Sequence, residues 1–268
     1  MSASRLAQPD VGILTQSEME ETARSVIQAA GNVPVIIDGD TGFGGANNIR
    51  RTIRRFASTG AAAVSIEDQM FPKKCTYAAG SGVRVVSTVE AGNRIRAAVA
   101  ARDEARTLDG NSILIVARTD CRAAFGLEEA INRCKLFEEL GADIVYAENL
   151  QSREEYVYLR ACLKKETKTM LAQVQLFSPA EKYSDALYKE QTNLLSSDEV
   201  GNIGYDFVLF GVTALQATIQ ALKSTAHHML SNKGLVEETS KVSISSFEEV
   251  KKVIDFSESE NFESQYGT

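Results

Sequence analysis

Three carboxylates follow two neighbouring apolar runs of the chain, where they could hold a cation. Asp38 and Asp40 come directly after the run 33–37, and Glu67 follows the run 63–66. Residues two apart on an extended backbone project to the same side, so Asp38 and Asp40 share a face. Oxygen ligands without His or Cys suit a hard ion such as Mg²⁺. A lone Asp-x-Asp is more often a helix cap or a solvated pair, but with Glu67 nearby the pattern favours a metal site.

A thiol lies in a long, glycine-containing segment, residues 70–84. Lys73 and Lys74 directly precede Cys75, and cations beside a thiol favour the thiolate and lower its pKa. A cysteine is usually buried and inert, but one between cations on a glycine-bearing loop is less often so. We therefore expect Cys75 to be functional. The remaining cysteines are expected to be structural: Cys121, Cys134 and Cys162.

Further polar side chains stand at the ends of later apolar runs: Arg118 after 113–117, Glu148 after 144–147, and Gln173 within 170–174. A guanidinium can hold a carboxylate in a two-pronged grip, which makes Arg118 a candidate for binding an acidic substrate. Arg118 could instead pair with Asp120 or Glu148. Both interpretations can hold together, because acids and bases at strand ends form one network.

The elements that must position these side chains are short and apolar. Six runs rich in Val and Ile recur: 33–37, 63–66, 113–117, 144–147, 170–174 and 207–210. They are continuous rather than alternating, which is typical of strands buried on both faces of a parallel sheet. Stretches with helical periodicity separate them, so we predict an α/β fold built as a TIM-type (β/α)₈ barrel, whose chemistry lies where the strands end. A doubly wound sheet is the alternative, but its Gly-x-Gly-x-x-Gly fingerprint is absent.

The strand count predicts an incomplete barrel. A closed barrel needs eight strands, and the sequence contains six recognisable βα units; the segment before residue 33 contains one helix, about 16–30. Two missing strands would leave open edges. We assign residues 1–228 to the barrel domain and residues 229–268 to a polar linker and a C-terminal helical arm, with a short helix at Phe247–Phe256.

Composition excludes several classes of function. The 268 residues include 29 basic and 36 acidic side chains, a net charge of −7, and no Lys/Arg block, so nucleic-acid binding is not expected. No apolar run is long enough to span a bilayer, and the first residues lack the apolar core of a signal peptide. Two adjacent histidines, His227 and His228, provide little material for a catalytic triad. Few cysteines in a long chain suggest a cytoplasmic location, although organellar targeting stays open.

These residues resemble the isocitrate lyase / phosphoenolpyruvate mutase superfamily. The stretch Asp38-Gly-Asp-Thr-Gly-Phe-Gly-Gly is similar to its metal motif, and Glu67-Asp-Gln-Met-Phe-Pro-Lys-Lys-Cys75 to its gating loop. Similarity continues in Ile115-Val-Ala-Arg-Thr-Asp120 and Gly141-Ala-Asp-Ile-Val-Tyr-Ala-Glu148. The branch it resembles most is the carboxyvinyl-carboxyphosphonate phosphorylmutase, methylisocitrate-lyase-like and petal-death-type branch. The resemblance covers essentially the whole chain.

The resemblance implies a barrel that holds Mg²⁺, with Mn²⁺ as the alternative, and a small 2-oxo or 2-hydroxy carboxylate. It implies a metal site formed by Asp38, Asp40, Glu67 and Asp10. It implies catalytic residues Cys75, Lys73, Arg118 and Glu148, with Cys75 as proton donor and acceptor, and substrate-binding residues Cys75, Thr76, Arg118, Glu148 and Gln173. Members usually form homotetramers that exchange C-terminal helices.

The chain also departs from the pattern. Lyase-type members typically have Gly-His after the cysteine, where this chain has Thr76 and Tyr77. They usually present an Asn on the fifth strand, where this chain has Gln173, one methylene longer. The family's first two strands would lie before Met1. Phosphonate-forming mutases place Asn where Cys75 stands, which favours carbon–carbon chemistry over phosphoryl transfer.

Three hypotheses follow. The first is a Mg²⁺-dependent carbon–carbon lyase or hydrolase that acts on a small dicarboxylate such as a 2-alkylmalate, a methylisocitrate-like acid or oxaloacetate through an enolate. The second is a truncated, non-catalytic chain or a partner of full-length paralogous subunits. The third is a phosphoenolpyruvate or phosphonate mutase.

Overall fold

The structure is a computed structural model that describes residues 1–79, 82–174, 194–234 and 244–267. The chain separates into two compact units, Met1–Val212 and Thr213–Thr268. The boundary predicted after residue 228 lies inside helix α11 (Thr213–Ser231), which belongs to the second unit. The domain assignment itself stays a prediction.

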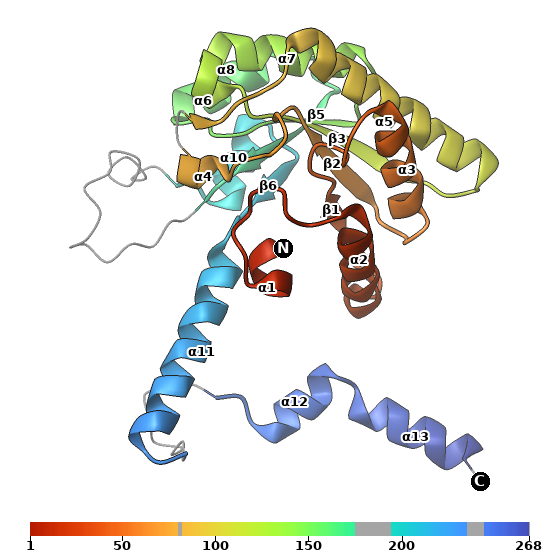
Figure 1. Cartoon of the computed structure of the whole chain (residues 1–268), viewed down its shortest axis with the longest axis vertical. Helices are drawn as coiled ribbons and strands as arrows, with labels where there is room; N and C mark the ends of the chain where they lie inside the picture. The colour runs from red at the N-terminus through yellow and green to blue at the C-terminus, as the bar shows by residue number, and fades with distance from the viewer. Residues whose placement is uncertain (80–81, 175–193, 235–243, 268) are drawn as a thin grey trace. The chain divides into compact units, whose positions relative to one another are not determined.

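A six-stranded parallel sheet forms the centre of the first unit (Figure 1). Its strands are β1 (Ile36–Asp38), β2 (Ala63–Glu67), β3 (Leu114–Thr119), β4 (Ile144–Ala147), β5 (Lys168–Ala172) and β6 (Phe207–Leu209). Each strand pairs with the next one along the chain, in the order β1-β2-β3-β4-β5-β6. All six predicted strands are therefore present, and the α/β prediction is confirmed.

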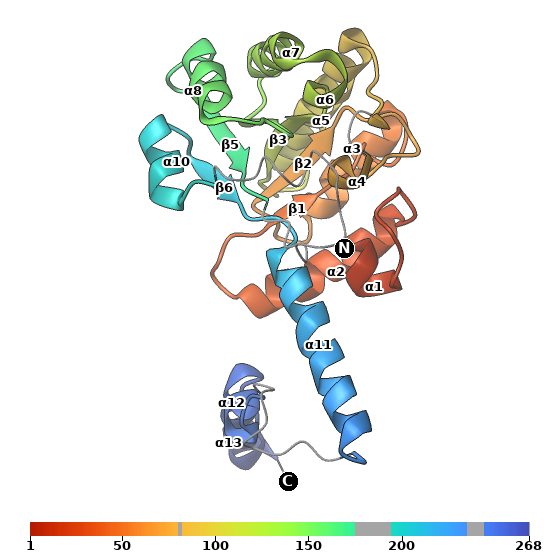
Figure 2. The same ribbon diagram turned by 90° about the vertical axis from the view of Figure 1, so that its left-hand side faces the viewer.

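The longer helices between the strands cover the outer face of the sheet (Figures 1 and 2). The described helices of this unit are α1 (Ser2–Leu6), α2 (Gln16–Ala30), α3 (Ala46–Ala57), α4 (Thr76–Ala79), α5 (Thr88–Leu108), α6 (Arg122–Phe125), α7 (Leu127–Glu139), α8 (Arg153–Cys162) and α10 (Ser197–Ile203). The helix predicted at 16–30 is α2, which begins with a capping box between Thr15 and Glu18.

The two faces of the sheet are buried differently, because alternate residues of a strand point to opposite sides. The outer face packs against the helices in the larger core cluster, with side chains such as Val64, Ile66, Ile115, Ala117 and Leu171. The inner face carries a separate, smaller cluster: Ala63, Val116, Ile144, Tyr146 and Met170. The inner face is the one that continues into the polar side chains at the strand ends.

The sheet curls into a half-barrel that the described residues do not close. β1 and β6 are its two edges, and neither pairs with a further strand in the part of the chain that the structure describes. Apolar inner-face residues on these edge strands remain 37–43% exposed: Ile36, Phe207 and Leu209. This confirms the prediction of an incomplete barrel with six βα units.

The second unit consists of α11, α12 (Phe247–Val253) and α13 (Phe256–Tyr266). The single helix predicted at Phe247–Phe256 was wrong: α12 ends at Val253, and a new helix begins after Asp255. Asp255 adopts a left-handed conformation with φ 52°, which a continuous right-handed helix cannot contain. None of the described helices combines the length and the apolar character that crossing a bilayer requires.

Candidate active site

The loop after β1 brings two carboxylates to the edge of the sheet. Gly39 passes so close to β2 that an added Cβ would lie 2.7 Å from the Ser65 carbonyl oxygen, so only glycine fits there. Asp40 then adopts a left-handed conformation with φ 49°, and its N–H donates to Asp38 Oδ1 at 2.9 Å. The turn thus fixes Asp38 and Asp40 relative to one another.

The ammonium group of Lys73 lies among these carboxylates. It donates to Asp40 Oδ1 and lies 3.2 Å from Asp10 Oδ1 and 4.0 Å from Asp38 Oδ2. Lys73 is 7% exposed, while about half of the Asp10 and Asp38 side chains is open to solvent. The sequence suggested that Lys73 acts on Cys75; the structure gives it carboxylate partners from α1–α2 and β1–α3 loops instead.

The electrostatics of this cluster reflect its crowding. Burial, followed by the negative charge of Asp38, raises the pKa of Asp40 to about 6, although Lys73 opposes the shift. Burial opposes ionisation of Asp38 as well, but Lys73 and Arg118 hold its pKa below the ordinary value. Burial disfavours the charged form of Lys73, but Asp38, Glu67 and Asp40 together raise its pKa above the ordinary value. The cluster therefore stabilises one buried cation.

Glu67 lies at the end of β2 with a side chain that is 2% exposed. Its Oε1 is buried and has no hydrogen-bond partner among the described residues. Burial raises the pKa of Glu67 well above its usual range, against the opposing effect of Arg118. A buried carboxylate oxygen without a partner is costly, which makes Glu67 suited to a ligand or to a bound water.

The carboxylate oxygens around Lys73 are the kind of ligand that a hard metal cation prefers. In this structure, however, the cation that they surround is the ammonium group of Lys73. In the described part of the chain, no group of three or more His, Cys, Asp or Glu side chains is gathered closely enough to hold a metal ion. The donor set of Asp38, Asp40 and Glu67 nevertheless consists of oxygen alone, with one buried oxygen still unpartnered. The donor chemistry of these residues fits Mg²⁺, but their positions in this structure do not form a metal site, which stays a prediction.

Arg118 extends from the end of β3 on the inner face, paired in register with Glu67 on β2 and Tyr146 on β4. Its Nε and Nη2 donate to the two carboxylate oxygens of Asp120 at 2.8 and 2.7 Å, and Nη2 lies 3.2 Å from Glu148 Oε2. Nη1 makes no hydrogen bond within the described residues. Asp120 and Glu148 both pair with Arg118, as the sequence allowed, and Nη1 remains able to receive a carboxylate.

Glu148 follows β4 and is fully occupied as an acceptor. The Tyr146 hydroxyl donates to Oε2, which also lies near Arg118 Nη2. The Tyr77 hydroxyl and the Asn149 N–H, at 3.1 Å, donate to Oε1. A carboxylate offers about four lone-pair positions. Glu148 therefore positions other side chains in this structure and has no acceptor left for a substrate.

The segment that carries the thiol crosses the strand ends. Cys75 is half-buried, between Lys73 and α4. The Thr76 hydroxyl donates to Asp120 Oδ1 at 2.8 Å, and the Lys74 N–H donates to Gln69 Oε1 at 2.9 Å. Burial and the neighbouring charge of Glu148 raise the pKa of Tyr77, so its hydroxyl stays protonated.

A buried ion pair lies beneath the site. Arg133 of α7 and Asp68 after β2 are 2.8 Å apart and 3% and 1% exposed. Asp68 also accepts from the Thr119 hydroxyl at 2.6 Å and from the Asp120 N–H at 2.9 Å. The pair thus fixes the backbone that carries Asp120, and through Asp120 it positions Arg118.

Replacing Arg133 with methionine is expected to lower the free energy of unfolding by about 3 kcal/mol, because Asp68 would stay buried without its partner. Urea unfolding followed by circular dichroism measures the change. The control is the same replacement, by methionine, of Arg50, which is 52% exposed in its pair with Glu104. It should lower the free energy of unfolding by less than about 1 kcal/mol. Equal losses in the two variants would contradict the structural role of the buried pair.

Gln173 lies directly after β5 and is 1% exposed. Its Oε1 accepts from the Leu195 N–H at 2.9 Å, and its Nε2 is buried without a hydrogen-bond partner in the described chain. Gln173 thus retains a donor for a ligand, and its predicted role in substrate binding stays a prediction.

Of the other cysteines, Cys121 and Cys134 are buried and Cys162 is half-buried. Burial raises the pKa of Cys121 to about 12, in keeping with an inert thiol.

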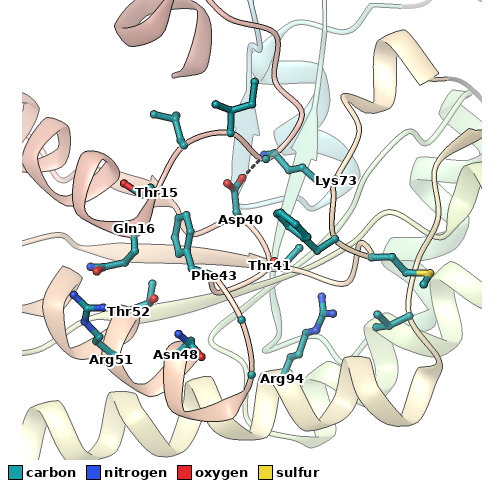
Figure 3. Close-up of a pocket in the computed structure, with 18 of the residues that line it drawn as sticks. Thr15, Gln16, Asp40, Thr41, Phe43, Asn48, Arg51, Thr52, Lys73 and Arg94 are labelled. Carbon is teal, nitrogen blue, oxygen red and sulfur yellow. Dashed lines mark hydrogen bonds and ion pairs between the residues drawn. The ribbon is translucent and has the colours of Figure 1, made fainter.

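A cavity of about 820 Å³ opens beside the Asp40–Lys73 pair (Figure 3). Residues 12–17, the loop after β1, the start of α3 and the segment 70–73 line it. Polar side chains in its wall include Gln16, Asn48 and Arg94. Of the predicted metal residues only Asp40 lines the cavity, and Arg118, Glu148, Gln173 and Cys75 do not line it.

Eight of the ten sequence-predicted site residues fall into two groups joined by Glu67, and within the described residues Cys75 and Gln173 make no hydrogen bond or ion pair with either group. One group surrounds Lys73, with Asp10, Asp38 and Asp40; the other surrounds Arg118, with Thr76 and Glu148. Glu67 connects them because its Oε2 lies 3.6 Å from Arg118 Nε. The sequence indicates Asp120 as a partner of Arg118, but the roles of Tyr77 and Tyr146 were not predicted. A signal was available for Tyr146, because it stands two residues before Glu148 on the same strand face.

The chain is similar in sequence to one family model and to several known enzymes. The family model described as phosphoenolpyruvate phosphomutase matches residues 1–230. The chain is 35% identical over 221 residues to 2,3-dimethylmalate lyase of Eubacterium barkeri, covering 82% of this chain and 68% of that protein. It is 37% identical over 225 residues to 2-methylisocitrate lyase of Aeropyrum pernix, covering 84% and 65%. It is 32% identical over 269 residues to the chloroplastic carboxyvinyl-carboxyphosphonate phosphorylmutase of Arabidopsis thaliana, covering 99% and 72%.

Solved structures agree. Oxaloacetate acetylhydrolase in complex with 3,3-difluorooxalacetate superposes with a TM-score of 0.82 at 27% identity, covering 99% of this chain and 82% of that one. 2,3-Dimethylmalate lyase superposes with a TM-score of 0.83 at 28% identity, covering 99% and 80%. The chain belongs to the isocitrate lyase / phosphoenolpyruvate mutase superfamily, an enzymatic family whose members here are carbon–carbon lyases and hydrolases and phosphoenolpyruvate mutases. It spans 62–68% of the length of the first four curated relatives.

Proposed function

We propose that the chain is a Mg²⁺-dependent carbon–carbon lyase or hydrolase for a small 2-hydroxy or 2-oxo dicarboxylate. One observation carries the proposal. Asp38, Glu67 and Arg118 lie at the ends of three successive strands. A carboxylate cluster that balances a buried cation therefore lies beside a guanidinium whose Nη1 makes no hydrogen bond to the described residues. A dianion between a cation and a guanidinium is the charge pattern that an enolate-forming cleavage requires.

Asp38 and Asp40 would hold Mg²⁺, with Glu67 and Asp10 contacting it through waters. When bound, the ion would stabilise the negative charge that develops as the bond breaks. Lys73 now occupies the neighbourhood of these carboxylates, so it would have to release Asp40 when the ion enters. The buried, unpartnered oxygen of Glu67 supports a water at this position.

The remaining residues bind substrate and move a proton. Arg118 Nη1 would receive a substrate carboxylate while Asp120 holds the other nitrogens in place. Cleavage leaves an electron pair on the carbon next to a carboxylate, and the Cys75 thiol would give that carbon a proton. Glu148, saturated by Tyr77, Tyr146 and Arg118, would orient these groups.

The relatives support the substrate class. They include enzymes named for 2,3-dimethylmalate and oxaloacetate, which are small dicarboxylates, and for 2-methylisocitrate, a small tricarboxylate. A 2-alkylmalate, a methylisocitrate-like acid or oxaloacetate is therefore the proposed substrate. Phosphonate chemistry is the second candidate, because the matching family model is named for phosphoenolpyruvate phosphomutase. The thiol at position 75 favours the lyases.

Product analysis tests the proposal. The purified chain is incubated with 2,3-dimethylmalate, 2-methylisocitrate, oxaloacetate or phosphoenolpyruvate, each with Mg²⁺ or with EDTA, and followed by proton and phosphorus NMR. We expect cleavage of one dicarboxylate that EDTA abolishes. A phosphorus signal for a new phosphonate would favour the second candidate, and a folded chain without turnover on any of the four would contradict an enzymatic role.

Mg²⁺ binding is expected to weaken as the pH falls through about 6. The pKa of Asp40 is raised to about 6, so its carboxylate is ionised above that pH and protonated below it. A proton and a metal ion compete for the same oxygens. Calorimetric titration with Mg²⁺ at pH 5 and pH 8 should show at least tenfold weaker binding at the lower pH. Equal affinity at both values would contradict Asp40 as a ligand.

We also propose a homo-oligomer, with full-length paralogous subunits as the alternative partner. The support is the set of inner-face residues at the barrel edges, which leave apolar surface that a partner would bury. Light scattering after size exclusion is expected to give a tetramer; a monomer at micromolar concentration would contradict it.

Four unpaired cysteines support a reducing, cytoplasmic compartment, and the chloroplastic relative keeps organellar targeting open.

A further inference from the structure

Two consecutive hydroxyls join the thiol-bearing segment to the carboxylates that hold Arg118. The Thr76 hydroxyl donates to Asp120, which grips Arg118 through two hydrogen bonds. The Tyr77 hydroxyl donates to Glu148, whose other oxygen lies 3.2 Å from Arg118 Nη2. The same two anions therefore position both the guanidinium and the loop.

The loop is held on the other side of the cysteine as well. Lys73 is anchored to Asp40, and the Lys74 N–H donates to Gln69 Oε1. The Gln69 amide nitrogen in turn lies 3.3 Å from Asp120 Oδ1. Cys75 thus stands between an anchor at the β1 carboxylates and two anchors at the ends of β3 and β4.

Most of the contacts that hold the loop are hydrogen bonds to ionised carboxylates. Hydrogen bonds to an ionised carboxylate are roughly twice as strong as bonds between neutral groups, and all the anchors named here are of that kind except the Lys74–Gln69 bond. Tyr77 is largely buried, and its hydroxyl fills an acceptor position of Glu148 that nothing else described occupies. Removing either hydroxyl would free the loop on one side without changing its anchors on the other.

We propose that Thr76 and Tyr77 are positioning residues that clasp the Cys75 segment to Asp120 and Glu148, and so fix the thiol relative to Arg118. The importance of these contacts for catalysis rests on the proposed function, since the position of Cys75 affects the reaction only if the thiol transfers a proton. Their effect on the exposure of Cys75 can be measured without any turnover. The clasp sets how often the thiol leaves its place over the strand ends.

The four cysteines of the chain allow a test without any substrate. The full-length chain and its variants Tyr77→Phe, Thr76→Val and Thr76→Ser are treated with iodoacetamide, and the rate at each cysteine is measured by peptide mass spectrometry. Cys162, half-buried on α8, reports local exposure elsewhere, and the buried Cys121 and Cys134 report unfolding. Tyr266→Phe, at an exposed tyrosine of α13, is the matched control.

We expect Tyr77→Phe and Thr76→Val to raise the alkylation rate of Cys75 by about tenfold to a hundredfold, as loss of a hydrogen bond to a charged group implies. Thr76→Ser keeps the hydroxyl, so the alkylation rate of Cys75 should stay as slow as in the unaltered chain. Tyr266→Phe should not change the alkylation rate of Cys75 either. Rates at the other three cysteines should stay within twofold of the unaltered chain. In the same variants, kcat on the substrate identified by product analysis should fall more than KM rises.

Two results would overturn the clasp. One is a Cys75 rate that stays within twofold of the unaltered chain in both Tyr77→Phe and Thr76→Val. The other is a rise at Cys121 and Cys134 that equals the rise at Cys75, because the residues would then stabilise the fold in general. A chain that shows the expected alkylation pattern but cleaves no dicarboxylate would retain the clasp and reject the proposed function.

Discussion

Replacing Arg118 with lysine is expected to lower kcat/KM by about 10³-fold. A lysine keeps the positive charge but lacks the planar fork, so it cannot bind Asp120 through two nitrogens and offer a third to a substrate. Loss of one preorganised donor at a developing charge typically costs 10²–10³ in rate, and the misplaced Asp120 adds to that loss because it also anchors Thr76. Steady-state kinetics on the cleaved dicarboxylate measures the effect.

Arg122→Lys is the matched control for this experiment. Arg122 makes the same two-nitrogen contact with Glu155, with Nε 3.0 Å from Oε2, but it lies on α6 outside the site. Its replacement should leave kcat/KM within about threefold. If Arg118→Lys retained more than a tenth of the activity, the guanidinium would not be the group that holds the substrate carboxylate.

Replacing Cys75 with serine is expected to lower kcat by 10²–10⁴-fold, the range that a general acid typically contributes. A hydroxyl is a far weaker acid than a thiol, so it would not protonate the carbanion at a comparable rate. Because the change leaves Arg118 and the carboxylates untouched, inhibition by oxalate, a small planar dianion, should change less than about threefold. Single-turnover kinetics and an oxalate inhibition series measure the two quantities.

Cys162→Ser controls for the loss of a thiol as such. Cys162 is half-buried at the end of α8, away from the strand ends that carry the site. Its replacement should leave both kcat and oxalate inhibition unchanged within error. Full turnover by Cys75→Ser would show that another group supplies the proton.

The strands and the carboxyl-end site could be predicted because their signals are local. Continuous apolar runs such as 144–147 have few alternatives to a buried parallel strand, and the structure places β4 there. Once strands are parallel, side chains that follow them must gather at one edge. The residues Asp38, Glu67 and Arg118 could therefore be grouped from the sequence alone.

The partners of Arg118 could be named because they too stand at strand ends, but other contacts between distant segments could not be predicted. Arg133 lies on an amphipathic helix, where a charged residue usually faces solvent, but it pairs with Asp68 across 65 positions of the chain. Tyr77 and Glu148 are 71 positions apart. Lys73 is a further example: its neighbours in the sequence are Lys74 and the thiol of Cys75, whereas in the fold its ammonium group donates to Asp40.

Crystallography with Mn²⁺ and oxalate would test most directly whether the β1 carboxylates and Arg118 hold the same dianion. The account predicts one anomalous peak next to the carboxylates of Asp38 and Asp40, with Lys73 moved away from Asp40 and oxalate bridging the ion and the Arg118 guanidinium. Ordered oxalate at Arg118 without any peak near Asp38 and Asp40, or a peak bound elsewhere, would contradict it.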